Sequence, residues 1–186
     1  MKGRPRSFAT EDVLEKAMTV FWRHGYEGAS LGRLQAATGL TPPSIYNAFG
    51  SKEGLYEACL DHYAGSVGAR HVATLSRPAS RAGVRAFLLA ATREYTRAGR
   101  PPGCMISTAS LHLSPELTSV CEATASRRSA TLDLLTEYLT EAGADSPATL
   151  ARFFGAVIQG MSVQARDGAS EEELAALVDV ALAAWR

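Results

Sequence analysis

Apolar residues recur every three to four positions along most of this chain, and this periodicity limits the fold more than any other sequence feature. Two stripes are clearest, Leu150 to Met161 and Leu174 to Trp185, and both occupy positions i, i+3, i+4, i+7, i+8 and i+11. This spacing forms one face of an α-helix. Alternating, β-branched strand patterns are missing, and Gly- and Pro-rich breaks separate the periodic segments. The sequence therefore predicts an all-α fold of about nine helices.

Capping residues and helix breakers place the individual helices. Thr10, Ser30, Thr41 and Ser51 are suited to begin helices, and Gly25 is suited to end one. The expected ranges are about 10–24, 31–38, 42–49, 52 toward 75, 80–98, 103–112, 115–141, 147–166 and 170–185. We expect a three-helix head, residues 1–52, joined through the fourth helix to a helical body, residues 53–186.

Composition excludes several classes of protein. With 186 residues, 46% of them apolar and 20% charged, the chain can bury a core without disulfides or metals. Its three cysteines, Cys59, Cys104 and Cys121, lack zinc-ligand spacing, so we expect no metal site and no cofactor. Cys104 and Cys121 are either redox-sensing or, by default, inert buried thiols. No apolar run is long enough for a signal peptide or a membrane span, which favours the cytoplasm.

Residues 31–49 have the layout of a helix-turn-helix. Two short predicted helices flank Gly39–Leu40–Thr41, where Gly allows the turn, Leu40 fills the gap and Thr41 caps the second helix. Pro42 and Pro43 fit the first two helical positions because those backbone N–H groups would have no helical partner. The second helix thereby loses two backbone donors, so its side chains must do more of the base reading.

Charge is consistent with a nucleic-acid partner for the head. Residues 1–52 carry seven basic and four acidic side chains, whereas residues 53–186 carry an excess of three acidic ones. Lys52 follows the Ser51 cap at a helix start, where a lysine is unfavourable unless a phosphate lies there too. The alternative is a solvated lysine. Arg4 and Arg6 form either a minor-groove arm or a tail that aids solubility.

Three stretches together resemble a known family. They are His24–Leu31, with its Gly-Tyr turn; Ala36–Leu40; and Ser44–Leu55, which holds Tyr-x-x-Phe and Ser-Lys-Glu. Over about residues 8–56 the chain is similar to the DNA-binding head of the tetracycline-repressor (TetR-like) family of bacterial regulators. The resemblance implies a ligand-responsive transcriptional regulator, most often a repressor, that binds a palindromic operator as a homodimer.

The resemblance also implies roles for individual head residues. Tyr46 and Lys52 match phosphate-binding positions, and Phe49 matches an aromatic residue that packs the head. Many relatives have His where this chain has Ala48, so the operator preference cannot be transferred from a relative. The expected DNA-contacting residues are Arg4, Arg6, Thr41, Pro42, Pro43, Ser44, Tyr46, Asn47 and Lys52.

A regulator of this kind needs a dimer interface and an effector pocket. The two C-terminal stripes are the candidates for an intersubunit four-helix bundle, through Phe153, Val157, Met161, Leu174, Val178, Leu182 and Trp185. The alternative is that these stripes pack only within the subunit. A mainly apolar pocket for a small organic effector is expected in the body, with candidate lining residues Phe87, Tyr95, Met105, Thr108, His112, Cys121, Phe154 and Gln159. Each of these is otherwise ordinary core or surface. Arg100, Arg127, Arg128 and Arg152 either bind an anion or are solvated.

Two other function classes are alternatives to a DNA-binding regulator. An enzyme is disfavoured because the sequence has no Gly-rich phosphate loop, no G-x-S-x-G, no H-E-x-x-H and no catalytic residues that we could assign. A helical small-molecule-binding or interaction module without DNA activity is the second alternative. Salt-sensitive binding to a promoter fragment would separate a regulator from both.

Overall fold

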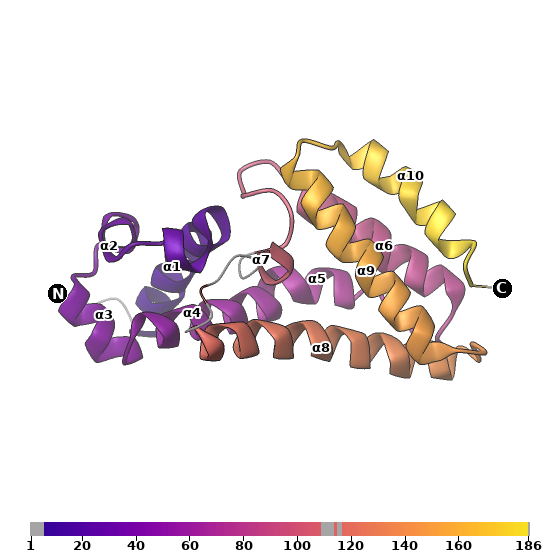
Figure 1. Ribbon diagram of the computed structural model, residues 1–186, viewed down its shortest axis with the longest axis horizontal. Coiled ribbons are helices and arrows are strands. Elements are labelled where there is room, and N and C mark those ends of the chain that lie inside the picture. The colour runs from indigo at the N-terminus through magenta and orange to yellow at the C-terminus, as the bar shows by residue number, and fades with distance from the viewer. Residues whose placement is uncertain (1–5, 109–113, 115–116, 186) are drawn as a thin grey trace.

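The computed structural model describes residues 6–108, 114 and 117–185 of the chain, and in these residues every regular element is a helix (Figure 1). If the rod α4–η1–α5 is taken as one unit, this part of the chain holds nine helical units, as predicted. The bounds are α1 Arg6–Gly28, α2 Leu31–Thr38, α3 Pro42–Phe49, α4 Lys52–Tyr63, η1 Ala64–Gly68, α5 Ala69–Val72, α6 Arg81–Tyr95, α7 Met105–Thr108, α8 Thr118–Glu141, α9 Pro147–Arg166 and α10 Glu171–Leu182.

The head consists of α1, α2 and α3, packed on the beginning of α4. Its core holds an aromatic cluster in which the rings of Phe21 and Tyr26 pack against Tyr56, with centroids 5.0 and 5.2 Å away. Leu34 of α2 and Ile45 of α3 are completely buried beside it. These contacts fix the two short helices, which are too short to be stable alone.

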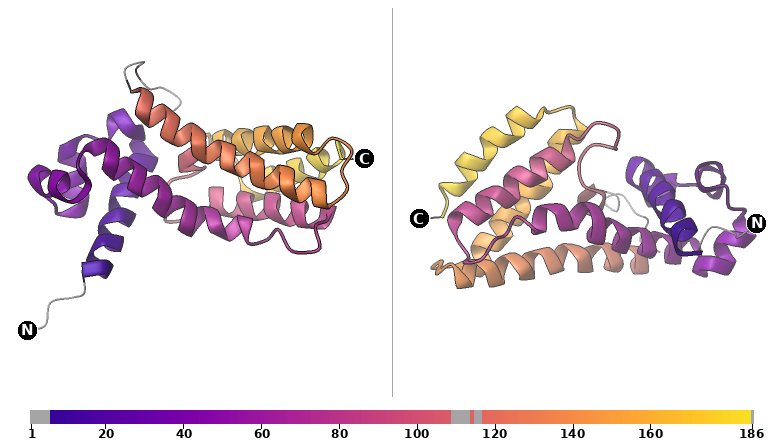
Figure 2. Two further views of the ribbon diagram at one scale, coloured as in Figure 1. Left: turned by 90° about the horizontal axis from the view of Figure 1, so that it is seen from below. Right: turned by 180° about the vertical axis from the view of Figure 1, so that it is seen from behind.

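The body is a layered bundle that extends away from the head. Helix α8 packs along α9, and α10 packs on α6, while α4 also reaches α8. Figure 2 shows that the head lies at one end of the molecule and the C-terminus at the other. One packing detail is glycine-dependent: a Cβ on Gly83 would overlap the hydroxyl group of Tyr138, which donates to the carbonyl of Ser76 at 2.9 Å.

Several predicted helix ends differ from the structure. Helix α1 begins at Arg6, so Thr10 lies inside it and does not cap it, and α6 ends at Tyr95 and not near residue 98. Gly25 takes a positive φ of 69° as expected, but helical turns resume after it and α1 continues to Gly28. The fourth helix was predicted to continue without interruption toward residue 75. Instead it changes at Ala64 into a π-helical segment that ends at Gly68, before α5. A π-helix has i→i+5 hydrogen bonds in place of i→i+4 bonds, and the apolar periodicity of the sequence does not reveal this change.

Candidate DNA-binding surface and effector cavity

Helix α3 is anchored on one side and open on the other. It begins at Thr41, whose Oγ1 accepts the backbone N–H of Ser44 at 3.4 Å and lies 2.9 Å from the Ser44 Oγ. Ile45 is completely buried, whereas Tyr46 is 46% exposed and Pro43, Asn47 and Ala48 are exposed. The predicted cap, the two helix-starting prolines and the outward polar side chains are therefore all present, and α3 offers its free face to a partner.

Lys52 is fixed at the start of α4 rather than extended into solvent. Its ammonium lies 4.3 Å from the ring centroid of Tyr26, a cation–π contact. Partial burial lowers the pKa of Lys52, and the nearby carboxylates of Glu53 and Glu27 oppose that shift. The Tyr26 hydroxyl donates to Glu53 at 2.6 Å, which lowers the pKa of the Glu53 carboxyl. The ammonium is thus held near the amino end of α4, where Ser51 accepts the N–H of Gly54.

Most of the expected basic arm precedes the first described residue, Arg6. Arg4 lies outside the described residues. Arg6 is the first residue of α1, and the structure describes nothing of its side chain.

The body contains a cavity of about 230 Å³ between the α4–η1–α5 rod and helices α6, α7, α8 and α9. Three of the predicted effector residues line it, Phe87, Tyr95 and Gln159. The other lining residues are Tyr63, Ala64, Gly68, His71, Val72, Cys104, Ile106, Ser107, Arg127, Arg128, Ala130, Thr131, Leu132, Leu134, Gly155 and Ile158.

Four predicted pocket residues do not line this cavity. Met105 and Phe154 belong to helices that border the cavity, as expected. Their side chains, however, are completely buried in the core and do not line the cavity. Thr108 turns back to donate to the carbonyl of Cys104 at 2.8 Å. Cys121 is half-buried on α8 and is not among the lining residues. His112 lies outside the described residues.

Two buried polar groups of the cavity lining have no hydrogen-bond partner among the described residues, the Tyr63 hydroxyl and the His71 Nδ1. Burial lowers the pKa of His71 to about 4, with a smaller opposing effect of Glu94, so this imidazole is neutral at pH 7. Sequence reasoning missed both residues. The sequence placed both residues on the helix that leaves the head. No local sequence pattern showed which face of that helix borders a cavity.

Arginines at the cavity already have partners. Arg127 donates to Asp61 at 2.6 Å and to the carbonyl of Ala123 at 2.9 Å, and Arg128 donates to the carbonyl of Ile106 at 3.1 Å. Asp61 therefore compensates the charge of Arg127, Arg128 is hydrogen-bonded to the backbone, and most of the lining is apolar.

The predicted dimer face requires a correction. Met161, Leu174, Val178, Leu182 and Trp185 are each at most 8% exposed within the single chain, so they pack α9 and α10 onto their own body. For these five the alternative of packing within the subunit is the one realised. Of the seven, only Phe153, 39% exposed, and the half-buried Val157 remain accessible. Among the described residues, Val163 of α9 and Val180 of α10 are further exposed large apolar residues.

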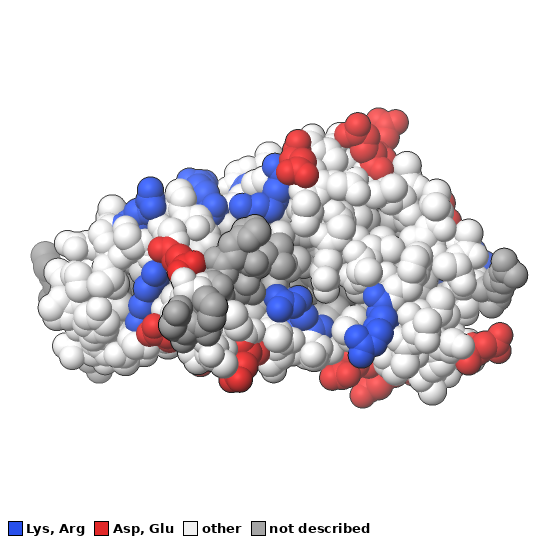
Figure 3. Space-filling model, viewed as in Figure 1, with Lys and Arg blue, Asp and Glu red and all other residues white. Residues whose placement is uncertain are grey.

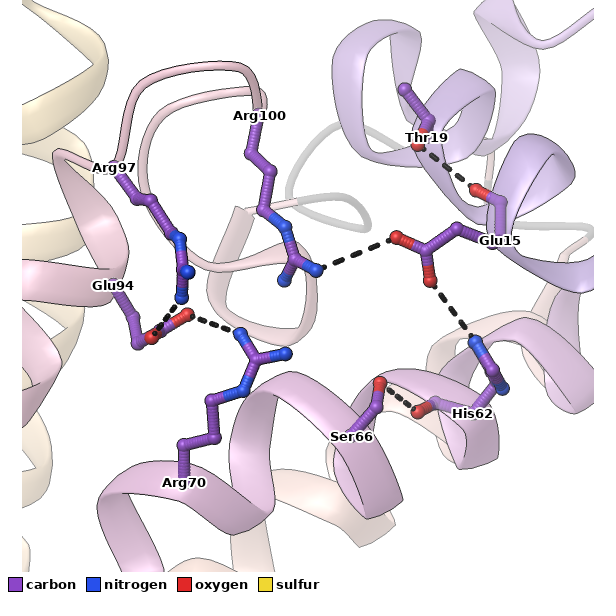
Figure 4. A network of polar contacts seen from close by, with 8 residues as sticks. All are labelled: Glu15, Thr19, His62, Ser66, Arg70, Glu94, Arg97 and Arg100. Carbon is purple, nitrogen blue, oxygen red and sulfur yellow. Dashed lines mark hydrogen bonds and ion pairs between the residues drawn. The ribbon is translucent and has the colours of Figure 1, made fainter.

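A chain of polar contacts joins head and body (Figure 4). Glu15 of α1 contacts the Nε2 of His62 at 3.1 Å and the Nη2 of Arg100 at 3.5 Å. In the same region Glu94 contacts both Arg70 and Arg97, at 3.2 and 2.9 Å. The head is therefore tied to the body through side chains as well as through α4.

The described residues contain no cluster of His, Cys, Asp or Glu suited to a metal ion, and no helix among them is long and apolar enough to span a membrane.

A helix-turn-helix head with an open second helix, joined to a hollow all-helical body, defines a DNA-binding transcriptional regulator. Residues 13–59 match the model of the bacterial regulatory proteins of the tetR family. The HTH-type transcriptional repressor ComR of Escherichia coli K12 is 34% identical over 99% of this chain and 92% of its own length. The chain therefore belongs to the TetR family.

Other relatives agree. The HTH-type transcriptional repressor BdcR of Escherichia coli K12 is 29% identical over 96% of this chain and 90% of its own length. Among solved structures, a cysteine mutant of the TetR family regulator CifR, complexed with 26-bp double-strand operator DNA, superposes with a TM-score of 0.90. It is 39% identical, over 98% of this chain and all of its own. These relatives are transcriptional regulators rather than enzymes.

Proposed function

We propose that this chain is a cytoplasmic repressor that binds a palindromic operator as a homodimer through α3 and is released by a small organic effector in the body cavity. We keep the division into a head, residues 1–52, and a body, residues 53–186. Helix α4 begins at Lys52 and packs against α1 and α3 as well as α8, which makes it the connection between the two.

The exposed face of α3 carries the proposal of DNA binding. An eight-residue helix that buries Ile45 and exposes Tyr46 and Asn47 next to Thr41 fits a major groove, where side chains read base edges. Tyr46 lies within α3 and Lys52 is the first residue of α4, on either side of the Gly50–Ser51 turn, which suits contacts to backbone phosphates beside the groove.

A dimer is expected because a single short recognition helix binds DNA weakly. Two copies related by a two-fold axis bind a palindrome, so a shared face is needed. We assign it to the exposed apolar residues Phe153 and Val163 of α9 and Val180 of α10. Exposed Ala156 and Gly160 between the two α9 positions allow close approach of a partner helix.

The cavity defines the class of effector. Its volume of about 230 Å³ lies below the usual range for drug-sized ligands, about 300–1,000 Å³, so the effector is small. The lining is mainly apolar, and the Tyr63 hydroxyl and neutral His71 are its polar groups with no hydrogen-bond partner among the described residues. Further polar residues of the lining are Ser107, Thr131, Gln159, Arg127 and Arg128. A compact apolar molecule with one uncharged hydrogen-bonding group fits this arrangement.

The DNA test uses a promoter fragment from beside the protein's own gene. For about six phosphate contacts per dimer, the logarithm of the DNA-binding constant should fall against the logarithm of the salt concentration with a slope near −5. Asn47→Ala should weaken specific binding with little change in slope, because it removes a base contact and no charge. Equal affinity for this fragment and for unrelated DNA would favour the alternative, a helical module without DNA activity.

The dimer test replaces the exposed apolar residues. Phe153→Glu with Val180→Glu should convert the dimer into a monomer in light scattering and abolish tight operator binding. The matched control is Gln164→Glu, an exposed α9 residue, which should remain dimeric. A dimer that persists in the double variant would disprove the assigned face.

The effector test screens small apolar alcohols, ketones and amides for a rise in Tm and for release of the promoter fragment. Tyr63→Phe keeps the ring and removes only the hydroxyl, so it should weaken effector binding and leave operator affinity unchanged. A molecule that fills the cavity without changing operator affinity would contradict the effector role.

A further inference from the structure

A second hollow, of about 200 Å³, lies where head and body meet and is lined mainly by arginines. Its lining residues are Arg23, Arg100, Pro101, Pro102 and Arg166. They come from α1, from the connection between α6 and α7, and from the last residue of α9. Three guanidinium groups from three separate elements thus face one space, and none of its described lining residues is a carboxylate.

The connection after α6 holds Arg100 in place. Gly99 and Gly103 take positive φ angles of 83° and 80°, and the N–H of Gly103 donates to the carbonyl of Tyr95 at 2.8 Å. Pro101 is buried beside them, and the Arg100 side chain is only 22% exposed. Its Nη1 is buried and, within the part of the chain that the structure describes, no hydrogen-bond acceptor pairs with it.

The other two arginines also have N–H donors that their contacts with the described residues do not use. Arg166 uses a single nitrogen, Nη1, for the carbonyl of Trp22 at 3.3 Å and the hydroxyl of Thr108 at 3.4 Å. Arg23 is exposed and makes no hydrogen bond or ion pair with the described residues. Each guanidinium carries five N–H donors, so the existing contacts leave most of them available to a ligand.

Positive charge exceeds negative charge around this hollow. Among residues 6–108, 114 and 117–185, the one carboxylate in contact with any of the three guanidinium groups is Glu15, and its 3.5 Å contact with Arg100 is long. Glu15 also contacts His62 (Figure 4). Figure 3 shows Lys and Arg gathered along the upper edge of the head and its junction with the body, and acidic residues over the start of α10.

We propose that Arg23, Arg100 and Arg166 form a binding site for a small phosphate-class dianion at the junction of head and body. Guanidinium groups match the oxygens of a tetrahedral anion through paired N–H donors, and three of them compensate two negative charges despite Glu15. The volume suits inorganic phosphate or a small phosphate ester and is too small for a drug-sized ligand.

The position of the hollow favours a free anion over a DNA phosphate. Helix α3 lies at the far end of the head, while the connection that carries Arg100 lies between head and body in both Figure 1 and Figure 2. A duplex lying along α3 therefore faces away from the arginines. This site is separate from the body cavity, with which it shares no lining residue.

The experiment titrates the full chain with inorganic phosphate, and separately with sulfate, by calorimetry at pH 7.5, with ionic strength held constant by chloride. Tm is measured in the same solutions. We expect one site per chain and a saturable rise in Tm with both dianions. Arg23→Gln should weaken binding about tenfold while leaving the starting Tm unchanged, because Arg23 supports no other contact.

Two further variants test the charge argument. Arg152→Gln, the matched control, changes an exposed α9 arginine outside the hollow and should bind phosphate like the unmodified chain. Glu15→Gln removes the competing carboxylate and should tighten binding.

Three results would overturn the proposal. The first is a Tm that responds equally to phosphate and chloride. The second is equal weakening by Arg23→Gln and Arg152→Gln, which would indicate a diffuse charge effect. The third is no phosphate binding together with a promoter-fragment salt slope that Arg23→Gln reduces by about one per subunit, which would assign the cluster to a DNA phosphate. None of these depends on the proposed effector.

Discussion

His71 should make the stability of this protein depend on pH between 5 and 7.5. The imidazole is 8% exposed, packs against the ring of Phe87 at 5.3 Å between centroids, and has a pKa lowered to about 4, mainly by burial. In the unfolded chain its pKa returns to about 6.5. Below about pH 6.5 the unfolded state binds a proton at this histidine and the folded state does not. The free energy of unfolding therefore falls as pH falls.

The size of this effect follows from the two pKa values. Between pH 7.5 and pH 5 the free energy of unfolding should drop by about 2 kcal/mol, and by about 3 kcal/mol once pH reaches 4. Carboxyl groups with lowered pKa, such as Glu53, contribute little above pH 5 because they stay ionised in both states. Their contribution is lost only as pH falls further, through their folded pKa values.

Urea denaturation at several pH values measures this slope. His71→Phe keeps a ring against Phe87 and removes both the titrating group and the unpartnered Nδ1, so it should abolish most of the slope without lowering stability at pH 7.5. His24→Asn changes an exposed histidine and should keep the slope. An identical pH dependence in His71→Phe and the unmodified chain would refute the assignment.

Three other substitutions have defined outcomes. Lys52→Ala should weaken operator binding and lower the salt slope by about one per subunit in anisotropy titrations, whereas Lys16→Ala, which removes only an exposed pair with Asp12, should not. Ile45→Ala should cost about 2–5 kcal/mol in urea denaturation, because it opens a cavity under α3. Gly54→Ala should lower Tm, since its Cβ would overlap the last carbonyl oxygen of α3, whereas Gly65→Ala meets open space and should not; equal Tm values would refute the close approach.

Local chemistry made the head predictable. The bounds 31–38 and 42–49 match α2 and α3 because a capping side chain and a positive-φ glycine define each helix from adjacent residues. Thr41 and its two prolines act within one turn, so no distant contact was needed to place them. The position of Lys52 over Tyr26 depends on packing between α1 and α4, which the sequence does not encode locally.

The body was harder because its features depend on which helices meet. Periodicity identified the apolar faces of α9 and α10 but not their partner, and five of the seven proposed dimer residues proved to pack within the chain. The cavity draws residues from seven elements, so sequence spacing found Phe87, Tyr95 and Gln159 and missed Tyr63 and His71. Arg23 and Arg166 lie 143 positions apart and only the fold brings them together.

The α4–η1–α5 rod has a consequence for both proposed sites. It is about 30 Å long, it starts beside α3 at Lys52, and Tyr63, Ala64, Gly68 and His71 along its far half form one wall of the cavity. No loop interrupts this rod. One end of it supports the reading helix, and the other end forms the wall of the cavity. The proposed effector site and the reading helix therefore rest on one continuous helical support.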